Sequence, residues 1–113
     1  MKTPSKRNRQ VADLIRREIA MLMKTSISDP RLEKMMITTV DLAPNLSNAR
    51  IFYILPNKDD NDQVIAALKK AKGFIRRALS SRVELRYTPQ ISFLYDDSID
   101  RARQLLSLMD DGE

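Results

Sequence analysis

Two apolar stripes of different helical phase meet at Gly73, and this junction constrains the fold more than any other feature of the sequence. The first stripe consists of Val64, Ile65, Leu68 and Ala71, and the second of Phe74, Ile75, Ala78 and Leu79. Each stripe has the spacing of one face of a helix. Because glycine inside a helix costs about 1 kcal/mol relative to alanine, a glycine at this junction needs a structural reason. The pattern therefore predicts two shorter helices joined by a bend at Gly73.

The spacing of apolar residues changes along the rest of the chain and indicates which segments are helices and which are strands. Residues 5–24 carry the i, i+3, i+4, i+7 stripe of an amphipathic helix. Residues 36–42 and 49–55 are rich in β-branched and aromatic residues and have turn residues between them, so they predict an antiparallel pair of strands. A third strand is predicted at 91–95, and Ser98 is placed to cap a last helix.

These elements, in the order α-β-β-α-kink-α-β-α, predict the α+β class, with helices packed on one three-stranded sheet. A chain of 113 residues is expected to form a single domain over residues 1–113, with residues 1–5 and 109–113 flexible. Since no coiled-coil pattern is present, we expect a monomer.

The residue types that usually carry catalysis are scarce. The sequence has no Cys and no His, which excludes disulfides, thiolate metal ligands and the commonest general base. Its glycines lie only at positions 73 and 112, which excludes glycine-rich phosphate loops and the nucleophile elbow. We therefore expect no enzyme, no metal site and no cofactor. Neither a signal peptide nor the roughly 20 apolar residues of a membrane span is found, so we expect a cytoplasmic protein without a membrane partner.

Positive charge is concentrated in the body of the chain. Residues 1–93 contain 18 basic and 9 acidic side chains, whereas residues 94–113 contain two basic and six acidic ones. The segment from Gln63 to Val83 has six basic residues and no acidic one, so salt bridges between i and i+4 cannot form within it. A polyanion that neutralises these charges is the economical explanation, and phosphate is the commonest candidate.

The sequence Asp29-Pro30-Arg31 has two interpretations. It predicts a turn that ends the first helix, because proline disfavours the helical conformation in the residue before it. Alternatively, the turn presents Arg31 at the edge of the basic surface. The spacing does not decide between the two.

Aromatic and acidic residues of the predicted strands also have two interpretations. Phe52, Tyr53 and Phe93 are of the types that stack on bases in RNA-binding sheets, but core packing is favoured for all three. Asp96 and Asp97 are expected to cap the last helix rather than to form a metal site, because adjacent residues of an extended chain point to opposite faces.

Four stretches of the sequence resemble one known family. They are VADLIRREIA in the first helix, DPRL after it, AKGFIRR at the bend, and LRYTPQISFLYDDSI near the end. In this order and spacing they resemble the ribosome-binding factor A family, over about residues 7–108. Gln10 departs from the family pattern, which commonly has Arg before the Val-Ala pair.

The resemblance implies a KH-like domain of type II topology, in which Ala71-Lys72-Gly73 forms a helix kink in place of the usual GxxG loop. It implies a ribosome assembly factor that binds the free or immature small (30S) ribosomal subunit and its 16S rRNA. Such a factor assists rRNA processing and late subunit maturation, and it supports growth at low temperature.

Charge and resemblance together predict that the first helix and the bent helical segment present basic side chains to rRNA phosphates. The predicted RNA-binding residues are Lys6, Arg7, Arg9, Lys69, Lys72, Arg76, Arg77, Arg82 and Arg86. Two other functions stay open. One is a general single-stranded nucleic-acid-binding protein with a KH-like fold, and the other is a protein-interaction module with an acidic partner.

Overall fold

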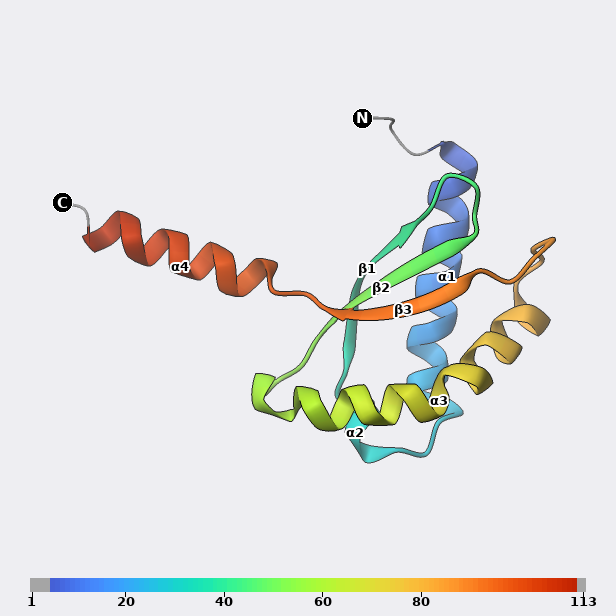
Figure 1. Cartoon of the computed structure of the whole chain (residues 1–113), viewed down its shortest axis with the longest axis horizontal. Helices are drawn as coiled ribbons and strands as arrows, with labels where there is room; N and C mark the ends of the chain where they lie inside the picture. The colour runs from blue at the N-terminus through green and yellow to red at the C-terminus, as the bar shows by residue number, and fades with distance from the viewer. Residues whose placement is uncertain (1–4, 112–113) are drawn as a thin grey trace.

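The chain forms an elongated α+β molecule with a three-stranded sheet at its centre (Figure 1). The structure is a computed structural model that describes residues 5–111. Its elements are α1 (Lys6–Thr25), α2 (Pro30–Glu33), β1 (Met36–Leu42), β2 (Asn48–Ile54), the 3-10 turn η1 (Lys58–Asp60), α3 (Asn61–Arg82), β3 (Gln90–Tyr95) and α4 (Ser98–Asp111). The predicted class and three-stranded sheet are confirmed, and the short elements α2 and η1 are additions to the predicted order.

β2 is the central strand of the sheet and has one antiparallel and one parallel neighbour. β1 pairs with β2 antiparallel, as predicted, whereas β3 pairs with β2 in parallel. A parallel pair needs a crossover connection, because the chain must return to the starting end of the sheet before the second strand begins. α3 is part of that connection, so the most basic segment of the chain runs beside the sheet (Figure 1).

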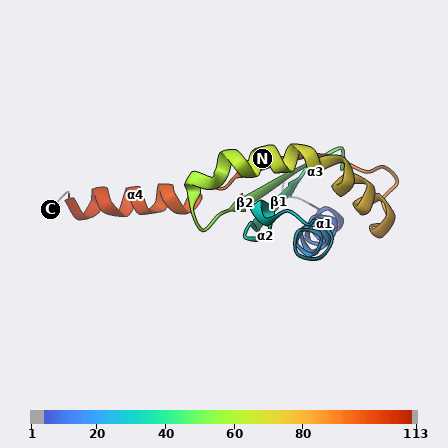
Figure 2. The same ribbon diagram turned by 90° about the horizontal axis from the view of Figure 1, so that it is seen from below.

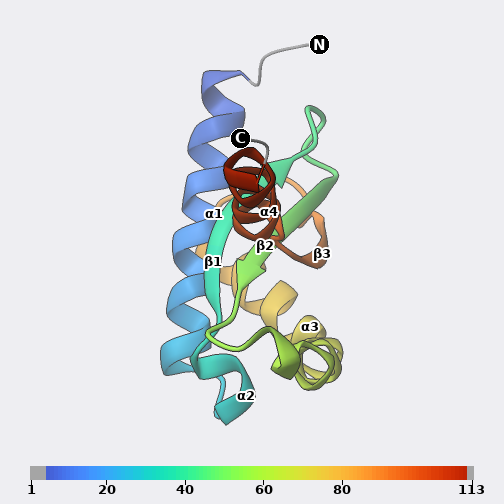
Figure 3. The ribbon, with the colours of Figure 1, turned by 90° about the vertical axis from the view of Figure 1, so that its left-hand side faces the viewer.

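α1 and α3 cover one face of the sheet. Ala49, Ile51 and Tyr53 of β2 are buried, whereas Arg50 and Phe52 between them are not, as expected for a strand covered on one side. α1 packs along β1, α3 packs against β3, and the two helices contact each other (Figure 3). The helices contribute Ile15, Ile19, Met23, Val64, Ala67, Leu68, Ile75 and Leu79 to the core.

The start of α1 is fixed by a polar contact that the apolar pattern does not reveal. The hydroxyl of Ser5 caps the helix by accepting a hydrogen bond from the backbone N–H of Asn8 at 3.0 Å. The buried side-chain amide of Asn8 donates to the carbonyl oxygens of Leu42 and Ala43, at 3.1 Å each. Since a buried polar group costs free energy unless it is hydrogen-bonded, Asn8 anchors the first turn of α1 to the end of β1.

α3 changes direction near its middle without a break (Figures 1 and 2). The predicted change of direction is therefore present, but within one continuous helix of 22 residues rather than between two shorter ones. Gly73 does not have a positive φ. A Cβ placed on it would lie 3.4 Å from Nη1 of Arg77. The bend therefore does not depend on a backbone conformation that only glycine adopts, and an added Cβ would meet only the flexible end of Arg77 at van der Waals distance.

α4 extends away from the sheet and from the other helices (Figures 1 and 2). Its residues Leu105, Leu106 and Leu108 are 61–68% exposed. The expectation that helices pack on the sheet therefore does not hold for α4. α1 and α3 already cover the core face of the sheet, and the apolar residues of α4 remain exposed to solvent.

The base of α4 is fixed by Asp96, in agreement with the predicted capping role. Oδ1 of Asp96 accepts a hydrogen bond from the backbone N–H of Ser98 at 3.0 Å, and Oδ2 accepts one from the hydroxyl of Thr38 at 2.6 Å. These bonds lower the pKa of Asp96 from its ordinary value. Asp97 forms an ion pair with Arg101 one turn into the helix, at 3.1 Å.

The chain ends predicted to be flexible lie mostly outside the described residues, which exclude residues 1–4 and 112–113. Ser5 caps α1, and residues 109–111 form the end of α4. Between residues 5 and 111, no helix has both the length and the apolar character that crossing a membrane would require.

Candidate nucleic-acid interface

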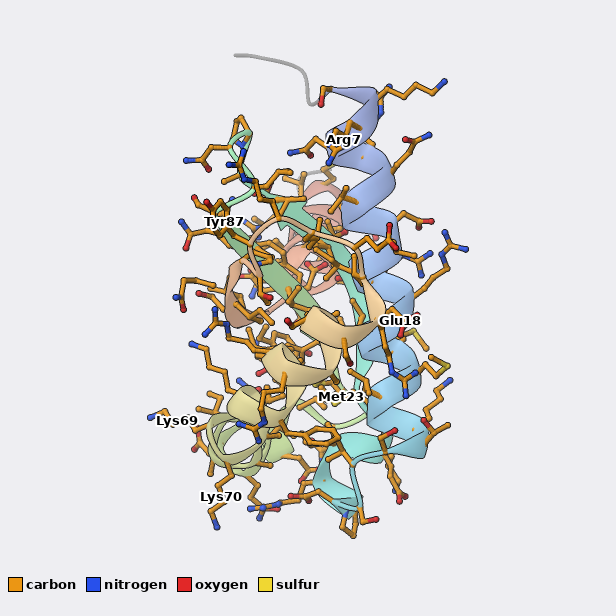
Figure 4. All side chains as sticks on the ribbon, turned by 90° about the vertical axis from the view of Figure 1, so that its right-hand side faces the viewer. Arg7, Glu18, Met23, Lys69, Lys70 and Tyr87 are labelled. Atoms are coloured by element: carbon orange, nitrogen blue, oxygen red, sulfur yellow. The ribbon has the colours of Figure 1, made fainter. Side chains whose placement is uncertain are left out.

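The predicted RNA-binding residues do not form one continuous surface. Figure 4 shows Arg7 and Tyr87 toward one end of the molecule and Lys69 and Lys70 toward the other. Arg7 belongs to the first turn of α1, whereas the two lysines belong to the first half of α3. Lys69 and Lys72 line one cleft, Arg7 and Arg86 line a second, and Arg9 lines a third together with Arg16.

The first is a narrow cleft between α3 and β3, called here the α3 cleft. Its volume is about 140 Å³, and it is lined by Ile65, Leu68, Lys69, Lys72, Ile91 and Phe93. Within residues 5–111, none of Lys69, Lys70 and Lys72 forms an ion pair with an acidic side chain. The charge of Lys70 contributes to lowering the pKa of Asp29, whereas Lys69 and Lys72 line the cleft itself. Neighbouring cations of this kind create a positive potential that attracts an anionic chain.

The three predicted kink residues lie in the middle of α3, where one packs on the core and two are exposed. Ala71 is partly buried and packs on the core, whereas Lys72 and Gly73 are exposed. The guanidinium of Arg77, one turn later, lies close to the backbone at Gly73.

Arg76 and Arg82 have partners within the protein, which sequence analysis did not foresee. Arg76 is partly buried, and its guanidinium donates hydrogen bonds to the carbonyl oxygens of Thr88 and Pro89, at 3.3 Å each. Arg82 lies 3.6 Å from the carboxylate of Glu18 on α1. Both side chains tie α3 to other parts of the fold, which leaves them less available than Lys69 or Lys72 for phosphate contacts.

A second cleft, called here the Tyr87 cleft, lies where three distant segments meet. It has a volume of about 530 Å³ and is lined by Arg7, Asn45, Leu46, Ser47, Leu85, Arg86, Tyr87, Thr88 and Gln90. The guanidinium carbon of Arg86 lies 5.7 Å from the centre of the Tyr87 ring. Two of the predicted RNA-binding residues, Arg7 and Arg86, are therefore brought together here although they lie far apart in the sequence.

The outer face of α1 is less positive than its sequence suggests. Asp13 forms ion pairs with Arg16 at 2.8 Å and with Arg17 at 3.0 Å. The hydrogen bond from Arg16, supported by the charge of Arg17, lowers the pKa of the Asp13 carboxyl although burial acts in the opposite direction. Lys6 and Arg9 are exposed at the start of the helix, and Lys24 is exposed in its last turn. Among the described residues, the cations of α1 without an ion pair therefore lie at the two ends of the helix.

The structure favours the turn interpretation of Asp29-Pro30-Arg31. Asp29 is the N-cap of α2, and its Oδ1 accepts from the backbone N–H of Arg31 at 3.0 Å. The guanidinium of Arg31 also donates to both oxygens of Asp29, at 3.0 and 2.8 Å. This pairing lowers the pKa of Asp29 and raises that of Arg31. The Arg31 side chain is therefore held in the turn by Asp29.

The aromatic residues are divided between the core and the surface. Tyr53 is buried and packs edge-on against Tyr95, with 5.8 Å between ring centres, and Phe93 packs against the core. Phe52 lies on the uncovered face of the sheet, with the guanidinium of Arg50 at 5.6 Å from its centre. The sequence pattern does not single out Tyr87, which is 75% exposed. Its only signal in the sequence is its place beside Arg86.

Comparisons with known proteins all lead to one family. The model for the family described as Ribosome-binding factor A matches residues 7–109 of the chain. The chain is similar to the Ribosome-binding factor A of Coxiella burnetii (strain RSA 493 / Nine Mile phase I), with 40% identity over 106 residues, which is 94% of this chain and 89% of the relative.

Solved structures agree with the observed fold. The crystal structure of ribosome-binding factor A from Thermus thermophilus matches with a TM-score of 0.69 at 23% identity, over 77% of this chain and 93% of that one. Coordinates of the T. thermophilus factor, a homology model fitted into the cryo-EM map of a 30S complex with that factor, match with a TM-score of 0.64 at 23% identity, over 76% of this chain and 91% of that one. These neighbours have a KH-like fold, and the chain shares it.

Proposed function

The chain belongs to the ribosome-binding factor A family, and from this membership we propose that it binds the free or immature small (30S) ribosomal subunit through 16S rRNA. In doing so it assists rRNA processing and late maturation of the subunit, including at low temperature. The observation that supports the proposal most directly is the pair of lysines that line the α3 cleft without an ion pair among the described residues, Lys69 and Lys72, with Lys70 next to them on the same helix. The T. thermophilus relative has been fitted into a map of a 30S complex, which agrees with this partner.

The proposed binding depends on neutralising phosphates and involves no covalent chemistry. Each Lys or Arg that contacts a phosphate releases counterions, so the affinity falls as the salt concentration rises. Such contacts fix the position of the RNA without reading its sequence. The protein acts in the cytoplasm as a monomeric binding factor and not as an enzyme.

The proposed contact residues are the predicted residues whose side chains form no ion pair and no hydrogen bond in the described part of the chain. They are Lys6, Arg7, Arg9, Lys69, Lys72, Arg77 and Arg86. Arg76 and Arg82 support these contacts indirectly, because the first holds the segment at Thr88 and Pro89 and the second ties α3 to α1.

Sedimentation of the protein with ribosomal particles tests this function. The protein is added to a cell extract and separated on a sucrose gradient, and each fraction is probed for it. We expect co-migration with free small subunits and not with complete ribosomes, and release when the salt is raised. Migration at the top of the gradient in low salt would contradict the proposal.

The same gradient separates the two other candidate functions. A general single-stranded nucleic-acid-binding protein would bind an unrelated oligonucleotide about as tightly as it binds small subunits. A module that docks on an acidic protein would keep its partner after ribonuclease treatment. The proposed function requires that ribonuclease release the protein and that unrelated oligonucleotides compete poorly with subunits.

A further inference from the structure

The Tyr87 cleft is built from segments that the charge pattern of α3 does not explain. Arg7 comes from the first turn of α1, Asn45 and Ser47 come from the turn between β1 and β2, and Tyr87 and Gln90 come from the segment that leads into β3. At about 530 Å³ its volume is in the range of small-ligand sites, whereas the α3 cleft, at about 140 Å³, is below it.

The turn wall of this cleft is fixed by hydrogen bonds. Leu46 adopts a positive φ of 63°, and its N–H donates to the carbonyl oxygen of Ala43 at 2.8 Å. The N–H and hydroxyl of Ser47 both donate to Oδ1 of Asn45, at 3.1 and 2.6 Å. These bonds engage the oxygen of the Asn45 amide, and Asn45 lines the cleft with its amide nitrogen still able to donate.

The opposite wall is fixed as well, although it belongs to no helix or strand. Pro89 is buried, and Arg76 donates to the carbonyl oxygens of Thr88 and Pro89 from α3. The N–H of Gln90 donates to the carbonyl oxygen of Ser47 at 2.9 Å and joins the two walls. The cleft is therefore preformed, which reduces the entropy that a ligand must lose on binding.

The chemistry of the walls fits a nucleotide. Tyr87 is 75% exposed and offers an aromatic surface, while Leu46 and Leu85 are partly buried and pack on the core. Arg86 lies over the Tyr87 ring, with its guanidinium carbon at 5.7 Å from the centre, and Arg7 adds a second positive charge. Stacking on aromatic rings and charge contacts to phosphate are the two interactions by which proteins hold unpaired nucleotides.

We propose that the Tyr87 cleft holds one unstacked nucleotide of a single-stranded RNA segment. The base stacks on Tyr87, the amides of Asn45 and Gln90 donate to or accept from its edge, and Arg7 and Arg86 contact the flanking phosphates. This proposal rests on the proposed function, since it specifies which form of RNA the protein holds at the end of the molecule away from Lys69 and Lys70 (Figure 4).

NMR titration of the full chain tests the proposal. The probe is a single-stranded RNA octamer of alternating cytidine and adenosine, which cannot pair with itself. We expect the amide signals of Ser47, Tyr87 and Gln90 to shift on titration. Because stacking contributes about 1–3 kcal/mol per base, Tyr87→Ala should weaken octamer binding at least about fivefold. Tyr87→Phe keeps the ring and is the matched control, with binding close to that of the unchanged protein.

Several results would overturn the proposal. They are octamer shifts confined to residues 65–77, equal affinities of Tyr87→Ala and the unchanged protein, and no shift at the cleft up to millimolar octamer. Equal shifts with the octamer paired to its complement, or with free adenosine monophosphate, would likewise exclude an unstacked nucleotide of a strand as the ligand. The same spectra report whether each variant is folded.

Failure of this proposal can be distinguished from failure of the proposed function. If the unchanged protein sediments with small subunits but the octamer leaves the cleft signals unmoved, the cleft assignment is wrong and the function stands. If the protein does not sediment with subunits while the octamer still shifts Ser47 and Tyr87, the subunit is the wrong partner and the cleft assignment stands.

Discussion

The α3 cleft and the Tyr87 cleft carry the same sign of charge but obtain it in different ways. Lys69 and Lys72 lie on one helix within four residues of each other, so the sequence alone indicates their charge density. Arg7 and Arg86 lie near opposite ends of the sequence and meet only because β3 pairs with β2 in parallel. A run of like charge thus identifies an attractive surface, whereas a preformed cleft with an aromatic wall is a property of the tertiary structure.

The two clefts also differ in what holds them. The lysines of the α3 cleft are exposed and unpaired among the described residues, so they add charge without supporting the fold. The Tyr87 cleft is held by Asn8 through the end of β1 and by Arg76 through the segment before β3. Substitutions should therefore separate binding from stability at the first cleft and couple them at the second.

Removing the charge of the α3 cleft should have the largest effect. In the variant with Lys69, Lys70 and Lys72 each replaced by Ala, we expect subunit affinity to fall at least about tenfold and the log-log salt slope to become shallower by about 3. The unfolding midpoint in urea should not change. The control is Arg101→Ala/Arg103→Ala on α4, which removes exposed cations elsewhere. An unchanged salt slope would show that the α3 cleft does not face the RNA.

Asn8→Ala should destabilise the fold by about 2 kcal/mol, because the carbonyl oxygens of Leu42 and Ala43 lose their donor. Urea unfolding followed by circular dichroism measures this change. Gln10→Ala, at an exposed position of the same helix, should have little effect. If the two variants unfold alike, the anchoring role assigned to Asn8 is wrong.

Arg76→Ala should destabilise the fold by about 1 kcal/mol, because it removes the two hydrogen bonds to the segment before β3. We expect the NMR signals of Tyr87 and Ser47 to move while those of Lys69 and its neighbours do not. Arg77→Ala is the matched control and should leave the stability unchanged. Movement of the α3 cleft signals in Arg76→Ala would remove the distinction between the two clefts.

Gly73→Ala should stabilise the protein by up to about 1 kcal/mol, because glycine is unfavourable in a helix and its φ here is not positive. The flexible end of Arg77 is all that the added methyl group meets. Ala66→Gly, at an exposed position of the same helix, is the reciprocal control and should lose a similar amount. A loss of stability in Gly73→Ala would show that the bend needs glycine after all.

Lowering the pH should have the smallest effect on the free energy of unfolding, and the carboxyl groups responsible lie outside both clefts. The pKa values of Asp13, Asp29 and Asp96 are lowered in the folded protein by hydrogen bonds and neighbouring arginines. A lowered folded pKa contributes stability above the ordinary aspartate pKa near 4, and this contribution is lost as the pH falls through the folded values. We expect a constant urea midpoint from about pH 7 to 5 and a decline below about pH 4. Asp96→Asn should decline less, and a midpoint that stays constant to about pH 3 would contradict the assignment.

The sequence predicts the scaffold well because local patterns determine most of it. The helical stripes of α1 and α3, the β-branched runs of β1 and β2, and the bend at Gly73 all depend on neighbours within a few residues. The helix α4 is predictable for the same reason. The exposed position of α4 could not be predicted, because its apolar residues have the same spacing as those of a helix that packs on a sheet.

The candidate interface is predicted only in part, because its residues acquire their roles from distant partners. Arg82 has the sequence pattern of a free cation, but α1 brings Glu18 to 3.6 Å from it. Arg76 has the pattern of a phosphate contact, but the chain returns past it at Thr88. Tyr87 has no signal of its own, since nothing near it in sequence shows that Arg7 and the turn at Ser47 come to lie beside it.

The parallel pairing of β3 has a consequence for the order in which the chain folds. The turn between β1 and β2 spans residues 43–47, whereas β3 can join β2 only after residues 55–89 have been brought back. Closing the shorter loop costs less entropy, so the hairpin should form early and β3 should be added last. The lysines of α3 can thus be exposed on a formed helix before β3 pairs with β2, whereas the walls around Tyr87 form only after that pairing. During synthesis, attraction to a polyanion would then precede the ability to hold one of its nucleotides.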